Sequence, residues 1–174
     1  MEFFDVIQKR RSIRKFSDHP VEMEKIDQII DSALRAPSAR NSRSSELVIV
    51  SDPDVLSQLS IAKPGGAGFI KDAPLAIVVF ADPGKSGPSI ENAAIISIYI
   101  QLAAQALGLG SCWSHLRGNN HSKTQSSNDY ISSLLNVPKN LEVECIIAIG
   151  YPDEDKAPYG TDELSKDLVH QERY

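Results

Sequence analysis

A run of basic residues near the start of the chain is the densest set of side chains that could bind a charged molecule. Five cations fall within seven positions, with one serine among them: Lys9, Arg10, Arg11, Ser12, Arg14 and Lys15. Guanidinium groups bind phosphate oxygens in a bidentate manner, and a serine hydroxyl can hold a further oxygen. The run predicts an anion site, although the same cations could instead stay solvated at the negative end of a first helix.

Other motifs with catalytic or metal-binding potential are incomplete. Gly84-Lys85-Ser86 is similar to the end of a phosphate-binding loop, but Val79 stands where that motif requires glycine. Cys112, His115 and His121 could be zinc ligands, yet no fourth ligand is evident, so we expect no metal site. The sequence has no Gly-x-Ser-x-Gly motif and no Cys-x-x-Cys pair, and therefore offers no covalent catalyst.

Composition narrows the class of protein. The net charge is -5 and the isoelectric point is about 5.3, which argues against a general nucleic-acid binder or a protein of anionic membranes. The longest apolar run, residues 93–107, is short and interrupted by polar side chains, so we expect no membrane span. Two cysteines in apolar stretches fit a reducing compartment, and we expect a cytoplasmic protein. At 174 residues the chain predicts a single domain, residues 1–174.

Hydrophobic periodicity and turn residues predict the elements that must position the basic run. A first helix covers residues 3–10, and a second begins near 23 and ends near Ala36, because Pro37 cannot continue it. Strands are expected at 46–50, 75–80, 111–116 and 142–151, and helices at 55–61, 90–107 and 130–135. Mixed hairpin and crossover connections favour an α+β fold with one mixed sheet flanked by helices.

The helix at 90–107 is apolar nearly all round, which is typical of a helix buried in a fold or between subunits. Ser97, Gln101 and Gln105 recur every four residues along it. We expect this polar stripe to find a polar partner, either within the chain or across a subunit interface.

Four segments in order resemble one known family, the FMN-dependent nitroreductases. They are Arg10–Phe16, Arg35–Ser42, Ala103–Trp113 and Ile149–Pro152. The resemblance implies an α+β sandwich that forms an interlocked homodimer, with FMN bound at the interface by residues of both subunits.

The resemblance also implies roles for particular residues. Arg10, Arg11 and Ser12 would hold the FMN phosphate, ribityl chain and pyrimidine edge, with Arg14 near the flavin. The loop that reaches in from the partner would contribute Pro37, Ser38, Ala39 and Asn41, with Arg35 close behind. The strand after Gly-Leu-Gly would line the ring through Trp113, Ser114 and His115, and Lys156 would supply the tail cation of the phosphate site.

Two departures from the family pattern concern the substrate side. Arg43-Ser44-Ser45 replaces the common Gln-Pro-Trp, and the chain lacks the inserted region that often carries Glu-Gly above the flavin.

The resemblance implies an FMN-dependent oxidoreductase that takes a hydride from NAD(P)H and passes electrons to nitroaromatics, quinones or similar small acceptors by ping-pong kinetics. One alternative is an FMN carrier or storage protein without efficient turnover. Another is a non-flavin anion binder that uses Arg10 and Arg11.

Overall fold

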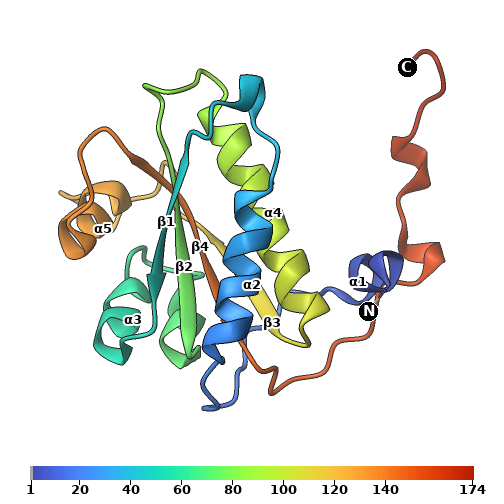
Figure 1. Cartoon of the computed structure of the whole chain (residues 1–174), viewed down its shortest axis with the longest axis horizontal. Coiled ribbons are helices and arrows are strands. Elements are labelled where there is room, and N and C mark those ends of the chain that lie inside the picture. Colours follow the sequence, from blue (N-terminus) through green and yellow to red (C-terminus); the bar gives the residue numbers. More distant parts are fainter. Residues whose placement is uncertain (1) are drawn as a thin grey trace.

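Four strands form one sheet in the computed structural model, which describes residues 2–174. The strands are β1 (Ser45–Val50), β2 (Leu75–Ala81), β3 (Gly110–His115) and β4 (Glu142–Gly150). Their order is β1-β2-β4-β3, and neighbouring strands pair antiparallel (Figure 1). The parallel part of the sheet is an isolated bridge between Ser12 and Ser111, so the expected mixed sheet is parallel only at the edge of β3.

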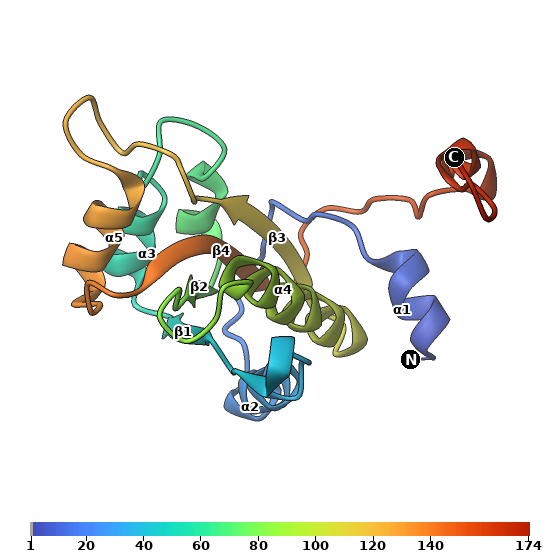
Figure 2. The same cartoon turned by 90° about the horizontal axis from the view of Figure 1, so that it is seen from above.

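Helices cover both faces of this sheet, as the α+β prediction requires. The helices are α1 (Phe3–Lys9), α2 (Met23–Leu34), α3 (Pro53–Leu59), α4 (Ser89–Ala106) and α5 (Ser127–Leu135). The view from above shows α2 and α4 on one side of the sheet and α3 and α5 on the other (Figure 2). Each expected helix and strand is present within a few residues of its predicted bounds.

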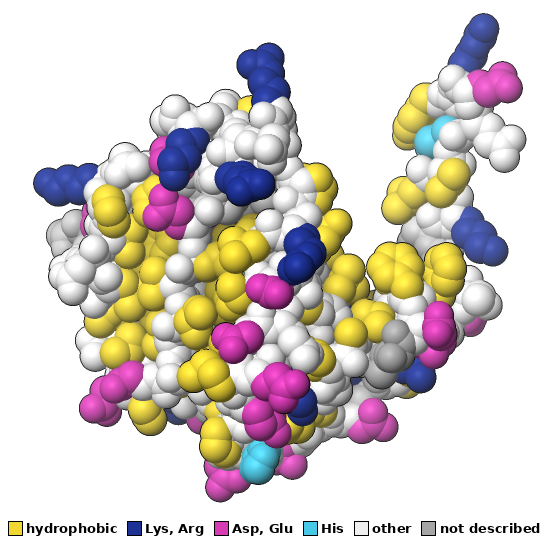
Figure 3. Space-filling model, in the orientation of Figure 1, with side chains coloured by type: hydrophobic (Ala, Val, Ile, Leu, Met, Phe, Trp, Pro, Cys, Tyr) yellow, Lys and Arg dark blue, Asp and Glu magenta, His cyan; other side chains and the backbone are white. Residues whose placement is uncertain are grey.

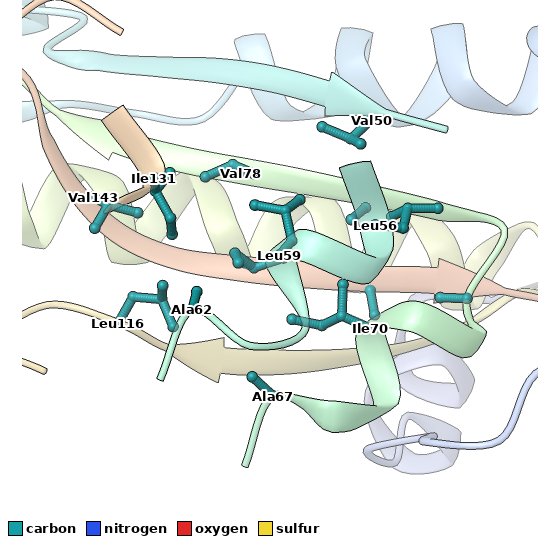
Figure 4. Close-up of a cluster of buried hydrophobic side chains, with 14 of the residues drawn as sticks. Val50, Leu56, Leu59, Ala62, Ala67, Ile70, Val78, Leu116, Ile131 and Val143 are labelled. Carbon is teal, nitrogen blue, oxygen red and sulfur yellow. The ribbon is translucent and has the colours of Figure 1, made fainter. Parts of the chain in front are cut away.

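The alternating side chains of the central strands supply two apolar cores. Val78 points to the α3 and α5 face and Ile77 to the α2 and α4 face, and every residue of β2 is buried. Figure 4 shows the first core, where Leu59, Ile70 and Ile131 meet beside β2. The continuous apolar run of β2 is therefore explained by burial on both faces.

The polar stripe of α4 is only partly what the sequence suggested. The Ser97 hydroxyl is fully buried, donates 2.7 Å to the Ala93 carbonyl oxygen and lies 3.3 Å from Cys145 Sγ. Gln101 is also buried within the chain. Pairing of Ser97 across a subunit interface is therefore wrong, because its hydroxyl already bonds inside the protomer.

The outward face of α4 is apolar instead. Ile98 and Tyr99 are 38% and 37% exposed, and Leu102 lies one turn further along the same side. This face continues toward α1, where Phe3 is 61% exposed. A stripe of large apolar side chains on a central helix is typical of a surface that another chain covers.

Two segments leave the body of the fold. The tail from Pro152 to Tyr174 carries only two short 3-10 helices, Thr161–Glu163 and Lys166–Leu168, and residues 161–174 are exposed throughout. Figures 1 and 2 show this tail and α1 projecting on one side. Figure 3 shows apolar side chains around α1 and along the tail. Leu168 and Val169 of the tail are each 74% exposed.

Local distortions shape the strands near their ends. Val79 pairs with Cys145 and Phe80 pairs with Val143, so Glu144 is an extra residue on β4, a β-bulge. A bulge of this kind aims the side chain of the extra residue independently of the strand's alternation. None of the helices in residues 2–174 is long and apolar enough to cross a membrane.

We predict that Gly110→Ala destabilises the protein, because Gly110 is the point where the N-terminal segment touches β3. A methyl group there would lie 2.8 Å from Ile13 Cβ, closer than real side chains approach. Overpacking of this kind costs about 1–3 kcal/mol, measurable by urea unfolding. Gly65→Ala is the matched control, since nothing lies within 4 Å of its new methyl group. Equal stability of the two variants would show that Ile13 does not pack on Gly110.

Candidate functional site

The basic segment is held against the free edge of β3. Its backbone forms the bridge Ser12–Ser111, and the Ile13 amide donates 3.0 Å to the Ser111 carbonyl oxygen. Ile13 and Phe16 bury their side chains in the core. Because side chains alternate along an extended segment, burial of Ile13 leaves its neighbours Ser12 and Arg14 directed away from the core.

The C-terminal tail closes over this segment. Lys156 Nζ donates 2.5 Å to the Ser12 carbonyl oxygen and lies 3.1 Å from Glu154 Oε1. Glu154 Oε1 also accepts the backbone amides of Arg14 and Lys15. The Arg14 amide, followed by Lys156, lowers the pKa of the Glu154 carboxyl group. Lys156 therefore lies beside the basic segment.

The arginines of the segment have different surroundings. The Arg11 guanidinium donates to the Ala157 carbonyl oxygen and lies 4.1 Å from the centre of the Tyr159 ring. Arg10 is the C-cap of α1, and Arg14 lies 6.0 Å from the Phe69 ring centre. Within residues 2–174, no ion pair joins any of these three arginines to a carboxylate. Their charge therefore remains available for an anion.

The free edge of β3 carries hydrogen-bond donors. Ser111 turns its polar backbone groups away from β4, toward Ile13, and the alternation of a strand places those of Trp113 and His115 on the same side. In the described part of the chain, neither of these two amides donates to another group. Two backbone N–H groups are thus presented at the edge, close to the cations.

A lysine that the sequence analysis missed borders this edge. Lys63 Nζ donates 2.7 Å to the His115 carbonyl oxygen, and partial burial lowers its pKa. Ser114 has a different position from the one expected, because its buried hydroxyl donates to the Gly66 carbonyl oxygen. The loop 63–66 is therefore a wall of the site, and its Lys63-Pro64-Gly65-Gly66 sequence is the signal that could have indicated it.

The remaining predicted residues form a second group in the loop after α2. Arg40, Asn41 and Arg43 all have positive φ values, between 47° and 54°, which is uncommon for residues other than glycine. Pro37 and Ser38 line a cavity of about 160 Å³ beside α4. Strained backbone in one short loop is frequent at functional sites.

One buried amide holds this loop in place. Asn92, in the first turn of α4, accepts a hydrogen bond from the Ala39 amide and donates to the hydroxyls of Ser42 and Ser44. Asn92 is 3% exposed. Arg35, by contrast, pairs with Asp31 at 3.4 Å on the surface of α2. Asn92 was not predicted, since an isolated asparagine in an apolar helix gives no motif.

A single protomer does not bring the two groups together. The loop is fixed to Asn92 at the start of α4, whereas Ser12 bridges to Ser111 after that helix has ended. The helix separates them by about 20 Å along its axis at 1.5 Å per residue. Figure 1 shows residues 39–41 beside the start of α4, whereas β3 begins just after the other end of the helix. Within one protomer the two groups therefore do not form a single site.

The three residues weighed as zinc ligands are also apart. Cys112 and His115 stand on opposite faces of β3, and His121 stacks on Tyr130 with 3.9 Å between ring centres. In residues 2–174 there is no group of three or more side chains suited to a metal ion.

Comparison with known proteins agrees with the geometry. The family model described as the Nitroreductase family matches residues 7–63 and 55–151. The structure of an FMN-dependent nitroreductase from Clostridium difficile R20291 is 44% identical, with a TM-score of 0.96 over 98% of this chain and 99% of that chain.

Two curated relatives extend this likeness. A provisionally named NADH dehydrogenase/NAD(P)H nitroreductase of Methanothermobacter thermautotrophicus is 33% identical over 177 residues, covering 100% of this chain and 88% of its own length. The FMN reductase [NAD(P)H] of Bacillus subtilis is 28% identical and covers 94% of this chain and 71% of its own. With a family model and a full-length relative both matching, the chain belongs to the nitroreductase family.

Proposed function

We propose that this protein is an FMN-dependent oxidoreductase that uses NAD(P)H to reduce small acceptors such as quinones and nitroaromatics. The observation that carries the proposal is the edge of β3, where unpaired backbone donors, arginines and a tail lysine meet. The relatives named as FMN-dependent and NAD(P)H-linked enzymes support it. FMN, when bound, supplies the two-electron chemistry that joins NAD(P)H oxidation to acceptor reduction.

The residues present fit this cofactor. Within residues 2–174, Arg10 and Arg14 form no ion pair with a carboxylate, and Lys156 pairs with Glu154. The excess of positive charge suits a phosphate. The Trp113 and His115 amides suit the acceptor atoms along the edge of a flavin ring. We propose that Arg11 acts mainly by tying the tail to the site, since its guanidinium already bonds to Ala157.

The other half of the site comes from a second copy of the chain in this proposal. Pro37, Ser38, Ala39 and Asn41 are too far from Ser12 within one protomer to share a ligand with it. The exposed apolar face of α4 and the projecting tail supply surfaces for a homodimer. We propose that residues 1–174 act as one FMN-binding domain within that dimer.

The two cysteines are free and buried. Free thiols persist in reducing compartments, and on this ground we propose a cytoplasmic location.

The test of the proposed function is the absorbance of the purified protein and its response to NADH and NADPH without oxygen. We expect a yellow protein whose visible flavin absorbance bleaches on reduction and returns on addition of 1,4-benzoquinone. A yellow protein that neither nucleotide bleaches would be an FMN carrier. A colourless protein that does not take up FMN would be a binder of another anion.

We predict that Lys156→Ala weakens FMN binding by roughly tenfold, the loss expected for one charge-assisted contact. Riboflavin, which lacks the phosphate, should bind the variant and the wild type equally. Fluorescence titration of the flavin-free protein measures both. Lys166→Ala, a change in the exposed part of the tail, is the control. Equal losses for FMN and riboflavin would mean that Lys156 acts through its bond to Ser12 and not through the phosphate.

We predict that Ile98→Glu dissociates the dimer. A carboxylate without a partner in a buried interface costs about 3–5 kcal/mol, which raises the dimer dissociation constant by more than about 100-fold. Sedimentation velocity over a range of concentrations measures the change. Ile61→Glu, which alters an exposed isoleucine outside α4, should leave the dimer intact. A wild-type protein that sediments as a monomer while binding FMN tightly would contradict the two-subunit site.

A further inference from the structure

A buried carboxyl group stands beside the end of β3 and has no role in the proposed FMN site. Glu144 is 5% exposed, whereas the side chains that face it, His115 and Arg117, are 48% and 51% exposed. The carboxyl group therefore lies beneath two side chains that reach outward. His115 also belongs to the edge that presents backbone donors.

The β-bulge accounts for the direction of this side chain. Cys145 points to the α2 and α4 face. Strict alternation would therefore send the preceding residue, Glu144, to the opposite face. Because Glu144 is the extra residue of the bulge, it shares the face of His115, which pairs with Cys145 across the strands. Bulges that redirect one side chain are frequent beside active sites.

Three charged or titratable groups from different elements face the carboxyl group. His115 Nδ1 of β3 lies 3.7 Å from Oε1, and Arg117 Nε, just after β3, lies 3.2 Å from Oε2. Glu91 in the first turn of α4 adds a like charge. Burial raises the pKa of Glu144, and His115 and Arg117 offset this only in part.

The contacts do not make a complete structural ion pair. Arg117 is close to Oε2 but not aligned to donate, so this buried oxygen lacks a hydrogen-bond partner. A buried carboxylate with unfilled lone pairs destabilises a fold relative to a neutral side chain of the same shape. Stability alone therefore gives no reason for an ionisable group at this position.

We propose that His115 donates the proton that acceptor reduction requires, and that Glu144 is the positioning residue that orients the imidazole through Nδ1. The inference rests on the proposed function, because it places His115 at the edge where the cofactor binds. With Nδ1 toward Glu144 and the side chain 48% exposed, Nε2 is the ring nitrogen left to donate to a bound molecule.

The proton balance is simple. Reduction of a quinone to a hydroquinone takes two electrons and two protons, of which NAD(P)H supplies both electrons and one proton as a hydride. The second proton passes from His115 Nε2 to a quinone oxygen, and the neutral ring regains a proton from water. Glu144 takes no part in this transfer and holds the ring through Nδ1.

Two acceptors separate a proton role from a structural one. The enzyme is first reduced with NADH and then mixed with 1,4-benzoquinone, which takes up protons, or with ferricyanide, which takes only electrons. General acid catalysis contributes about 10²- to 10⁴-fold, so we expect His115→Gln to slow reoxidation by benzoquinone by about 100-fold. Glu144→Gln should slow it on the order of tenfold, because the ring is present but less well oriented. Ferricyanide rates should stay within about twofold.

Matched variants sharpen the result. Glu142→Gln makes the same change on the same strand at an exposed position and should leave both rates unchanged. The double variant of His115 and Glu144 should be no slower than His115→Gln alone, because Glu144 acts only through the ring. If the variants slow reoxidation equally with both acceptors, or do not slow it with benzoquinone, the proposal is overturned. The proposed function still stands in that case, because NADH still reduces the enzyme. Failure of NADH to reduce the wild type overturns the proposed function and this inference together.

A stability measurement tests Glu144 without any turnover. Its pKa is raised in the folded state, so the folded protein holds that proton more tightly than the unfolded chain, and ionisation above the folded pKa reduces stability. Glu144→Gln should therefore unfold at higher urea concentration than the wild type at about pH 8, with the difference shrinking toward zero as the pH falls below about 4.3, where the unfolded side chain is protonated as well. A variant that is less stable at about pH 8 would show a structural ion pair and overturn the positioning role.

Discussion

The attachment of residues 12–16 to the free edge of β3 is the contact on which the rest of the site depends. The bridge from Ser12 to Ser111 sets the register, and Gly110 lets the Ile13 side chain approach the strand. The same segment then pairs with the tail through a second bridge, from Phe16 to Pro152. Because the tail is aligned in this way, Lys156 reaches Ser12 from more than 140 residues away in sequence. The free edge of β3 thus brings together residues 12–16 and the tail, which are remote from β3 and from each other in sequence.

Two features of the site reduce stability, and the fold compensates for one of them locally. The loop after α2 holds several non-glycine residues at positive φ, each of which costs on the order of 1–3 kcal/mol. Asn92 opposes this with three hydrogen bonds in a buried setting. Glu144 is compensated only in part by His115 and Arg117, and one of its oxygens lacks a hydrogen-bond partner. The hydrogen bonds of Asn92 thereby hold the strained loop in place. Oε2 of Glu144, by contrast, has no hydrogen-bond partner within residues 2–174.

Much of the fold was predictable from the sequence, because hydrophobic patterns and turn residues report local structure. The buried run of β2 and the stop before Pro37 identified their elements correctly. The resemblance placed Arg10, Ser12 and Lys156 in one region, and the structure brings their segments together. Lys63, Asn92 and Glu144 were missed, since their environment depends on loop contacts and on a bulge that no pattern of alternation encodes. The burial of Ser97 was missed for a similar reason, because a polar stripe does not show which side of a helix faces the sheet.

In the proposed dimer, the position of α4 explains why the two groups of site residues lie toward the two ends of one helix. A two-fold axis that pairs α4 with a second copy makes the contact reciprocal, so that a residue near the start of one helix and a residue near the end of the other meet twice. If the two helices run antiparallel, the start of one lies beside the end of the other. In that arrangement Asn92 holds the loop of one protomer beside the β3 edge of its partner. The two groups, which are about 20 Å apart within a protomer, would then meet across the interface at both sites. The apolar stripe at Ile98 and Leu102 lies midway between the two groups, where such an axis would pass. In the proposed dimer, the length of this helix and its apolar outer face therefore determine the geometry of the binding site as much as the cations do.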